Sequence, residues 1–254
     1  MGDVDFDFKS SFPAFDANVS IGRSMVRRVV MDSVGELIGA MDSCGVEKAL
    51  VYSPHAIECD TLDGNNDIVD ITKENNRLIP QFVSNPGIDD LESFKSSTLS
   101  AGVKSVRFDP GANKYPFVEW MVGSWLDWLV SERIPVWIQV AGVDPNEIHG
   151  TISGHLDLPI VLCGIHYQHI PWLMPLLKSL PNVYVEISRF VITDGVKRLI
   201  DAVGAGRILF GSRFPESSMG HQLYNLHRNG LSDSDLEAIC KGNLEGLLYP
   251  VGIN

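Results

Sequence analysis

Eight short apolar segments recur along this chain of 254 residues, and stretches with a helical spacing of apolar residues lie between them. The segments are residues 14–19, 49–53, 79–84, 103–108, 135–140, 159–163, 183–187 and 207–210. Strands that are apolar on both faces and alternate with helices are typical of a parallel sheet covered by helices. Eight such strands at this chain length predict an α/β fold, a single (β/α)8 TIM barrel, in preference to an open doubly wound sheet.

The residues that begin and end the helical stretches agree with this pattern. Gly45 and Gly204 each follow a helical stretch, as glycine commonly does just after a helix. Near the C-terminus, Ser232 is a suitable N-cap for a helix that runs through Cys240. Because no linker or low-complexity segment interrupts the chain, we expect one domain over residues 1–254.

The charge and the distribution of apolar residues argue against two classes of partner. The formal net charge is -12, and the lysines and arginines are scattered along the chain. Clustered cations are needed to bind a nucleic-acid backbone, so we expect no nucleic-acid partner. No apolar segment is long enough to span a bilayer, and the N-terminal segment MGDVDFDFKSSF lacks the apolar region of a signal peptide. We therefore expect a cytoplasmic protein that binds a small molecule and no membrane.

Active-site residues of a TIM barrel lie at the carboxyl ends of its strands. The polar side chains selected by this rule are Asn18, Ser20, Ser53, His55, Ser84, Asn85, Arg107, Asp109, Gln139, His166, Glu186, Ser188, Ser212 and Arg213. The two guanidinium groups keep their charge at physiological pH, so they predict contact with an anion. The alternation of side chains along a strand predicts that Asp16, Asn18 and Ser20 share one face of the first strand.

Several segments, in order along the chain, resemble the amidohydrolase-related family of metal-dependent hydrolases and decarboxylases. The resemblance rests on FDANVSIG near the start, on GVKSVRFDP, IPVWIQVAG, LPIVLC, LPNVYVEIS and RILFGSRFP, and on ICKGNLEGLL near the end. It covers nearly the whole chain, and its most specific part is the C-terminal third. The resemblance implies the same TIM barrel and the chemistry of a hydrolase or a lyase.

The resemblance also identifies the positions at which the family binds a divalent metal. The family's first strand ends in two metal-binding histidines, and Asn18 and Ser20 stand in those places. Gln139 and Gly164 replace the histidines of the fifth and sixth strands, and Arg213 replaces the catalytic aspartate of the eighth. Amide and hydroxyl oxygens are poor ligands for zinc, and an arginine adds a fixed positive charge. We therefore expect no metal and no other cofactor at the family's position.

His166, His55 and Glu186 are the candidate catalytic groups, each as an acid or a base. A structural interpretation remains open for all three. The histidines would make local hydrogen bonds in loops, and Glu186 would pair with Arg213, which would hold its pKa low. The same three side chains are the alternative ligands of a divalent metal such as zinc.

The substrate-binding candidates are the polar groups expected at the barrel mouth, Arg213, Arg107, Asn18, Ser20, Gln139 and Asp109. Arg213 suits a bidentate contact with a carboxylate or phosphate, and the alternative is an ion pair with Glu186 or Asp16. Arg107 and Asp109 form either a second contact with the anion or a salt bridge with each other.

Two functions remain open at this point. The first is a divergent hydrolase or lyase that acts on a small anionic substrate without the usual catalytic metal. The second is a non-catalytic pseudoenzyme that binds a small molecule or serves as a subunit of an assembly, because the aligned metal ligands and the catalytic aspartate are replaced. Homodimers are common among related barrels, so we expect a homodimer in either case.

Overall fold

The computed structural model describes residues 8–26, 28–29 and 31–250, so most of the N-terminal segment used to argue against a signal peptide lies outside the described residues. The described residues form strands that pair in parallel throughout. The strands are β1 (Ala14–Ser20), β2 (Val46–Tyr52), β3 (Leu78–Pro80), β4 (Phe82–Ser84), β5 (Val106–Phe108), β6 (Val136–Gln139), β7 (Ile160–Cys163), β8 (Val183–Glu186) and β9 (Ile208–Leu209). The strands form two sheets, one of β1 to β3 and one of β4 to β9. Within each sheet the strands lie side by side in the order in which they follow one another in the chain.

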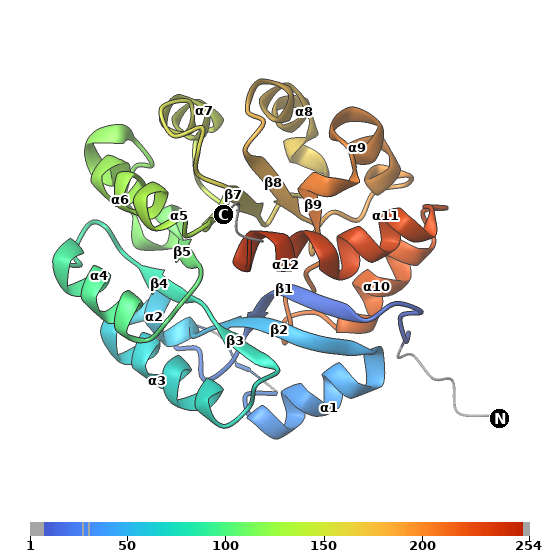
Figure 1. The fold of residues 1–254 in the computed structure, drawn as a ribbon, viewed down its shortest axis with the longest axis horizontal. Coiled ribbons are helices and arrows are strands. Elements are labelled where there is room, and N and C mark those ends of the chain that lie inside the picture. The colour runs from blue at the N-terminus through green and yellow to red at the C-terminus, as the bar shows by residue number, and fades with distance from the viewer. Residues whose placement is uncertain (1–7, 27, 30, 251–254) are drawn as a thin grey trace.

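Two seams join these sheets into one ring (Figure 1). At the first seam, β3 and β4 are the two halves of one predicted strand, and Gln81 between them donates its N–H to the Val51 carbonyl at 2.9 Å. At the second seam, the Ala17 N–H donates to the Phe210 carbonyl at 2.9 Å. With β3 and β4 counted as one strand, the predicted (β/α)8 TIM barrel is confirmed.

Helices surround the ring of strands (Figure 1). They are α1 (Val34–Cys44), α2 (Pro54–Glu58), α3 (Thr61–Lys73), α4 (Leu91–Ser100), α5 (Pro110–Asn113), α6 (Glu119–Glu132), α7 (Pro145–Ile152), α8 (Ile170–Ser179), α9 (Gly195–Val203), α10 (Met219–His227), α11 (Asp233–Glu237) and α12 (Asn243–Leu248), with short turns η1 (Tyr167–His169), η2 (Ala205–Arg207) and η3 (Ala238–Gly242). The capping residues explain the bounds of α1, because Ser33 and Glu36 form a reciprocal capping box and Gly45 ends the helix at φ 76°. Within the described part of the chain, every helix is too short or too polar to cross a membrane.

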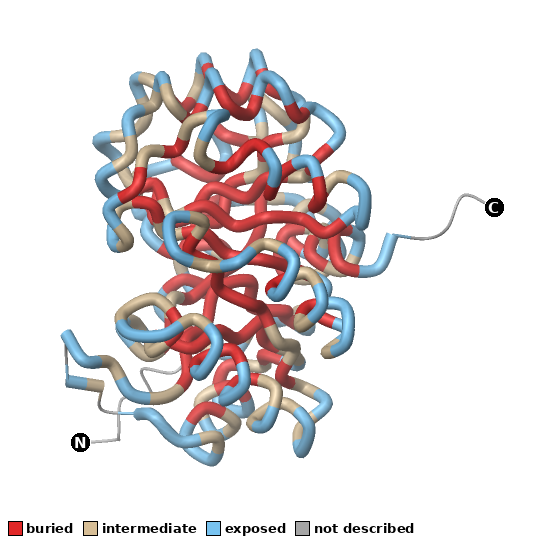
Figure 2. Tube along the Cα trace, turned by 90° about the vertical axis from the view of Figure 1, so that its left-hand side faces the viewer, coloured by how far each residue is buried: buried red, intermediate tan, exposed pale blue. Residues whose placement is uncertain are grey.

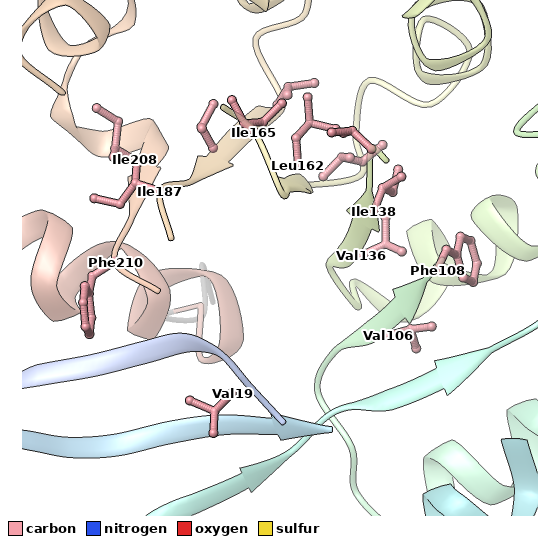
Figure 3. Packing of buried hydrophobic residues seen from close by; sticks show 14 of the residues in the cluster. Val19, Val106, Phe108, Val136, Ile138, Leu162, Ile165, Ile187, Ile208 and Phe210 are labelled. Atoms are coloured by element: carbon pink, nitrogen blue, oxygen red, sulfur yellow. The ribbon is translucent and has the colours of Figure 1, made fainter. Parts of the chain in front are cut away.

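Buried apolar side chains form one layer outside the ring of strands and another inside it. In the outer layer, Phe108 of β5 packs against Trp125 of α6 with ring centroids 6.3 Å apart, and Figure 3 shows further members of this layer. The inner layer contains Phe15, Trp137 and Leu209. Both layers lie in the middle of the molecule, where Figure 2 shows the buried segments. Successive side chains of a strand point to opposite faces, so one apolar strand supplies both layers.

The C-terminal helix closes one end of the barrel. The predicted helix after Ser232 does not end at Cys240, because α11 continues through the π-helical turn η3 into α12. Asn243 at the start of α12 donates hydrogen bonds to the carbonyls of Ala205 in η2 and Ile208 in β9, at 2.8 Å each. Leu244 and Leu247 pack into the inner apolar layer, and α12 lies across the ring in Figure 1. These contacts fill the end of the barrel where the strands begin.

This packing predicts that Leu244→Ala destabilises the fold by about 2–5 kcal/mol, because the change leaves a cavity beneath the barrel. Leu244 is 1% exposed, whereas Leu99 on α4 is 51% exposed and serves as the matched control. Urea unfolding followed by circular dichroism measures both variants, and Leu99→Ala should change stability by less than about 0.5 kcal/mol. Equal stability of the two variants would show that α12 does not close the core.

Candidate functional site

A cavity of about 570 Å³ opens at the carboxyl ends of the strands. We call it the mouth cavity. It is lined by Asn18, Val26, Tyr52, Pro54, Ile57, Glu58, Asp109, Ala112, Asn113, Gln139, Arg213 and Glu216. Four of the predicted substrate-binding residues are therefore brought together on its wall.

The end of β1 departs from the regular alternation that the sequence predicts. The pairing of β1 with β2 is irregular between Asp16 and Val19. Ala17 packs inside the barrel and Val19 outside it, while Asp16 Oδ1 accepts the N–H groups of Asn18 at 3.0 Å and Ser212 at 2.9 Å. The prediction that one face carries Asp16, Asn18 and Ser20 by simple alternation is therefore wrong, because a bulge turns the strand between them.

A buried polar network lies beneath the mouth cavity. Asn18 Nδ2 donates to Glu186 Oε2 at 2.8 Å, and Asn18 Oδ1 accepts from Arg107 Nη2 at 2.8 Å. Arg107 Nε donates to Gln81 Oε1 at 2.8 Å, and its guanidinium carbon lies 4.0 Å from the centre of the Tyr52 ring. These contacts with Asn18, Gln81 and Tyr52 keep the guanidinium of Arg107 inside the barrel. Asp109 instead caps α5 by accepting the Ala112 N–H, and no salt bridge to Arg107 is found among the described residues.

Glu186 does not behave as the sequence predicts. Burial raises the pKa of Glu186, although hydrogen bonds from Ser188 and Asn18 and the charge of Arg107 act in the opposite direction. The expected ion pair with Arg213 is absent from the described contacts, because Arg213 pairs with Glu216 three residues further along the chain. The predicted lowering of the Glu186 pKa by Arg213 is therefore wrong.

Gln139 fills the space that a side chain at position 164 would need. A Cβ added to Gly164 would lie 2.0 Å from Gln139 Oε1, and Gly164 also has a φ of 76°, which favours glycine. Gln139 Oε1 is buried and has no hydrogen-bond partner among the described residues. Gln139 also lines the mouth cavity, but this oxygen is directed toward Gly164.

Arg213 lies between the mouth cavity and a neighbouring hollow, and it lines both. Its backbone adopts the left-handed conformation, with φ 62°, which is uncommon for a residue other than glycine. The Arg213 N–H donates to the Asn18 carbonyl at 2.9 Å, and its side chain pairs with Glu216. The predicted alternative, an ion pair of Arg213 with Glu186 or Asp16, is therefore wrong, because Glu216 in the same turn supplies the carboxylate.

The remaining candidates are spread around the mouth. Ser20 Oγ donates to the Phe214 carbonyl at 3.5 Å. His55 lies in α2 and is not one of the described residues that line the mouth cavity, whereas His166 lines the neighbouring hollow. His55, His166 and Glu186 form no metal site among the described residues, so the alternative ligand set is wrong.

Sequence reasoning missed two residues that the site uses. Tyr52, which lies under the guanidinium of Arg107, is the last residue of β2 and could have been found by the rule that selected the other strand ends. Glu216 follows Arg213 by three residues, but nothing in the sequence shows that the turn folds the two side chains together.

Known proteins similar to this chain share its barrel. The sequence profile of a family described as Amidohydrolase matches residues 46–246, and no curated protein is significantly similar in sequence. An uncharacterized TIM-barrel protein from Bordetella bronchiseptica superposes with a TM-score of 0.75 at 16% identity, over 93% of this chain and 98% of that protein. A 5-carboxyvanillate decarboxylase from Sphingomonas paucimobilis superposes with a TM-score of 0.78 at 10% identity, over 94% of this chain and 99% of that protein. A dihydroxybenzoic acid decarboxylase from Polaromonas sp. JS666 superposes with a TM-score of 0.75 at 13% identity, over 93% of this chain and 97% of that protein.

The prediction that the chain takes no metal or other cofactor is contradicted by these structures. The decarboxylase from Polaromonas holds bound manganese with the inhibitor 2-nitroresorcinol, and other matched decarboxylase structures hold manganese as well. The loss of a metal therefore does not follow from the replaced residues.

The ligand set for such an ion is not found in the described residues. Among residues 8–26, 28–29 and 31–250, no three His, Cys, Asp or Glu side chains come together to hold a metal ion. Asn18 Oδ1, the cation-binding atom of that side chain, accepts a hydrogen bond from Arg107. A divalent cation bound to Asn18 Oδ1 would lie next to the guanidinium of Arg107, and the two positive charges would repel each other. The side chains present here do not fit the ion, and no chemical step is assigned to it.

The buried carboxyl group of Asp16 predicts a pH-dependent stability. Burial raises the pKa of Asp16 from the ordinary 3.8 to about 7, so the folded chain binds this proton over a range in which the unfolded chain has lost it. The contribution of Asp16 to the free energy of unfolding should therefore fall as pH rises from about 4 to about 7, by about 2–4 kcal/mol. Asp16→Asn mimics the neutral acid and should remove this loss.

Urea unfolding at several pH values measures the difference between wild type and Asp16→Asn. The exposed Asp70, whose side chain is 75% exposed, provides the control Asp70→Asn, which should follow the wild-type pH profile. A stability difference between Asp16→Asn and wild type that stays constant from pH 4 to 7 would contradict the protonation of Asp16 in the folded chain.

Proposed function

Because this chain belongs to the amidohydrolase family, we propose that it is a lyase that binds a small organic acid in the mouth cavity and releases its carboxylate as CO₂. The observation that carries this proposal is the cavity wall itself, in which Arg213 holds the carboxylate of Glu216 at the carboxyl ends of the strands. Structures of similar fold named as decarboxylases of 5-carboxyvanillate and dihydroxybenzoic acid support the choice of reaction.

Arg213 is the proposed anchor for the substrate. A guanidinium presents a planar fork of donors that matches a carboxylate, and Glu216 shows that a carboxylate reaches this fork. The substrate would exchange with Glu216, while the Gln139 amide, turned toward the cavity, accepts a hydrogen bond from a hydroxyl group on the same molecule. The anchor and the acceptor line one cavity, so both can contact one small molecule.

Asp109 is the proposed proton donor. It lines the mouth cavity, and burial raises its pKa despite the Ala112 N–H bond and the charge of Arg107. When the bond between carbon and carboxylate breaks, CO₂ leaves and the electron pair stays on the carbon. The proton of neutral Asp109 then forms the new C–H bond, and solvent returns a proton to the carboxylate.

A second candidate function is binding of the acid without turnover. The observation that favours it is the hydrogen bond between Arg107 and Asn18, which fixes two groups of the barrel interior to each other and away from a ligand. Binding and product formation are therefore measured separately, and all assays are run both with added Mn²⁺ and with a chelator.

The proposed anchor predicts that Arg213→Gln weakens binding of 2,6-dihydroxybenzoate about tenfold or more, because a charge-assisted contact with the carboxylate is lost. Isothermal titration calorimetry measures this loss. Arg198→Gln on α9 removes the same charge from an exposed position outside the cavity and should bind like wild type. Equal binding by wild type and Arg213→Gln would show that the acid is held elsewhere.

The proposed donor predicts that Asp109→Asn lowers the rate of product formation by about 100-fold or more. The asparagine keeps the N-cap of α5, so the fold should be retained. Asp144 caps α7 in the same way before a proline and lies outside the cavity wall, which makes Asp144→Asn the matched control.

Wild-type turnover, followed by chromatography of the decarboxylated product, should fall as pH rises through the raised pKa of Asp109, because the neutral acid is the active form. Full activity in Asp109→Asn would overturn its role. Tight binding of several small acids with no product would favour the non-catalytic alternative.

A further inference from the structure

The neighbouring hollow beside the mouth cavity has a volume of about 540 Å³. We call it the outer hollow. It is lined by His166, Tyr167, Gln168, Ser188, Arg189, Val191, Arg213, Glu216 and Ser217. These residues follow β7, β8 and β9, so the hollow lies at the same end of the barrel as the mouth cavity. Arg213 and Glu216 line both spaces, which makes their ion pair the partition between them.

Arg189 supplies a positive charge to the outer hollow. Arg189 is exposed, and among the residues that the structure describes none forms an ion pair with it. Arg213 is neutralised by Glu216, so Arg189 supplies the remaining charge. Burial and the nearby Arg189 lower the pKa of His166, which makes this imidazole neutral near pH 7.

His166 offers a hydrogen-bond donor in this neutral form. Its Nδ1 accepts the Gln168 N–H at 3.4 Å, so the ring proton lies on Nε2. The hydroxyl of Ser217 is a further donor on the wall of the hollow. A guanidinium, an imidazole N–H and a hydroxyl are together suited to an oxyanion with a single charge.

We propose that the outer hollow binds a second carboxylate of the same substrate, which is therefore a dicarboxylic acid spanning the two spaces. This inference rests on the proposed function, in which the reacting carboxylate contacts Arg213 in the mouth cavity. The reacting carboxylate contacts Arg213 in the mouth cavity, and the second carboxylate contacts Arg189, the His166 imidazole and the Ser217 hydroxyl, which line the outer hollow. The partition formed by Arg213 and Glu216 places the two binding spaces next to each other, within reach of one small molecule.

The test compares linear dicarboxylates from succinate to suberate with the monocarboxylates of equal chain length. Isothermal titration calorimetry measures their affinities for wild type, for Arg189→Gln and for the control Arg198→Gln. The chain length that binds most tightly gives the distance between the carboxylate sites in the mouth cavity and the outer hollow. At the best length, wild type and Arg198→Gln should bind the diacid about tenfold more tightly than its monoacid, and Arg189→Gln should lose that ratio.

The outcomes separate this inference from the function on which it rests. Monoacids that bind through Arg213, without a gain for any diacid, would overturn the outer subsite and leave the mouth cavity as proposed. A diacid preference that survives Arg189→Gln would also overturn it. If neither mono- nor diacids bind, the proposed function fails, and the outer subsite fails with it.

Discussion

The guanidinium of Arg107 lies inside the barrel, only 1% exposed, and the polar interior is arranged around it. A buried charge is costly unless it is paired and hydrogen-bonded. Gln81 and Asn18 accept its N–H groups, the Tyr52 ring covers its face, and Asn18 connects it to the carboxyl group of Glu186. These partners come from β1, β2, β8 and the junction of β3 with β4, so the position of one side chain constrains much of the ring.

Because Arg107 is buried, the polar groups that a ligand can reach lie at the mouth of the barrel. Arg107, Gln81, Asn18 and Glu186 are linked by hydrogen bonds inside the barrel, whereas Arg213 and Asp109 line the mouth cavity. α12 packs against the inner apolar layer at the opposite end of the barrel. The backbone of Arg213 is in the left-handed conformation, and its N–H bond to the Asn18 carbonyl connects this outer anchor to the buried network. The proposed substrate contacts therefore depend on the same β1 bulge that positions Asn18.

The sequence predicted the fold better than the site. Apolar segments located every strand because burial on both faces leaves a strong signal, and Gly45 located the end of α1 because helix caps act locally. The bulge in β1 and the inward position of Arg107 could not be predicted, since both depend on strands distant in sequence. The pairing of Arg213 with Glu216 was missed because a turn, rather than a residue pattern, brings these side chains together.

The most direct test of the account is a crystal structure of the protein with 2,6-dihydroxybenzoate bound. The account predicts that the carboxylate of the ligand lies in the mouth cavity within hydrogen-bond distance of the Arg213 guanidinium, with Glu216 displaced and the contact between Arg107 and Asn18 retained. A ligand that binds away from Arg213, or an ion pair of Arg213 and Glu216 that stays intact at saturating acid, would contradict it.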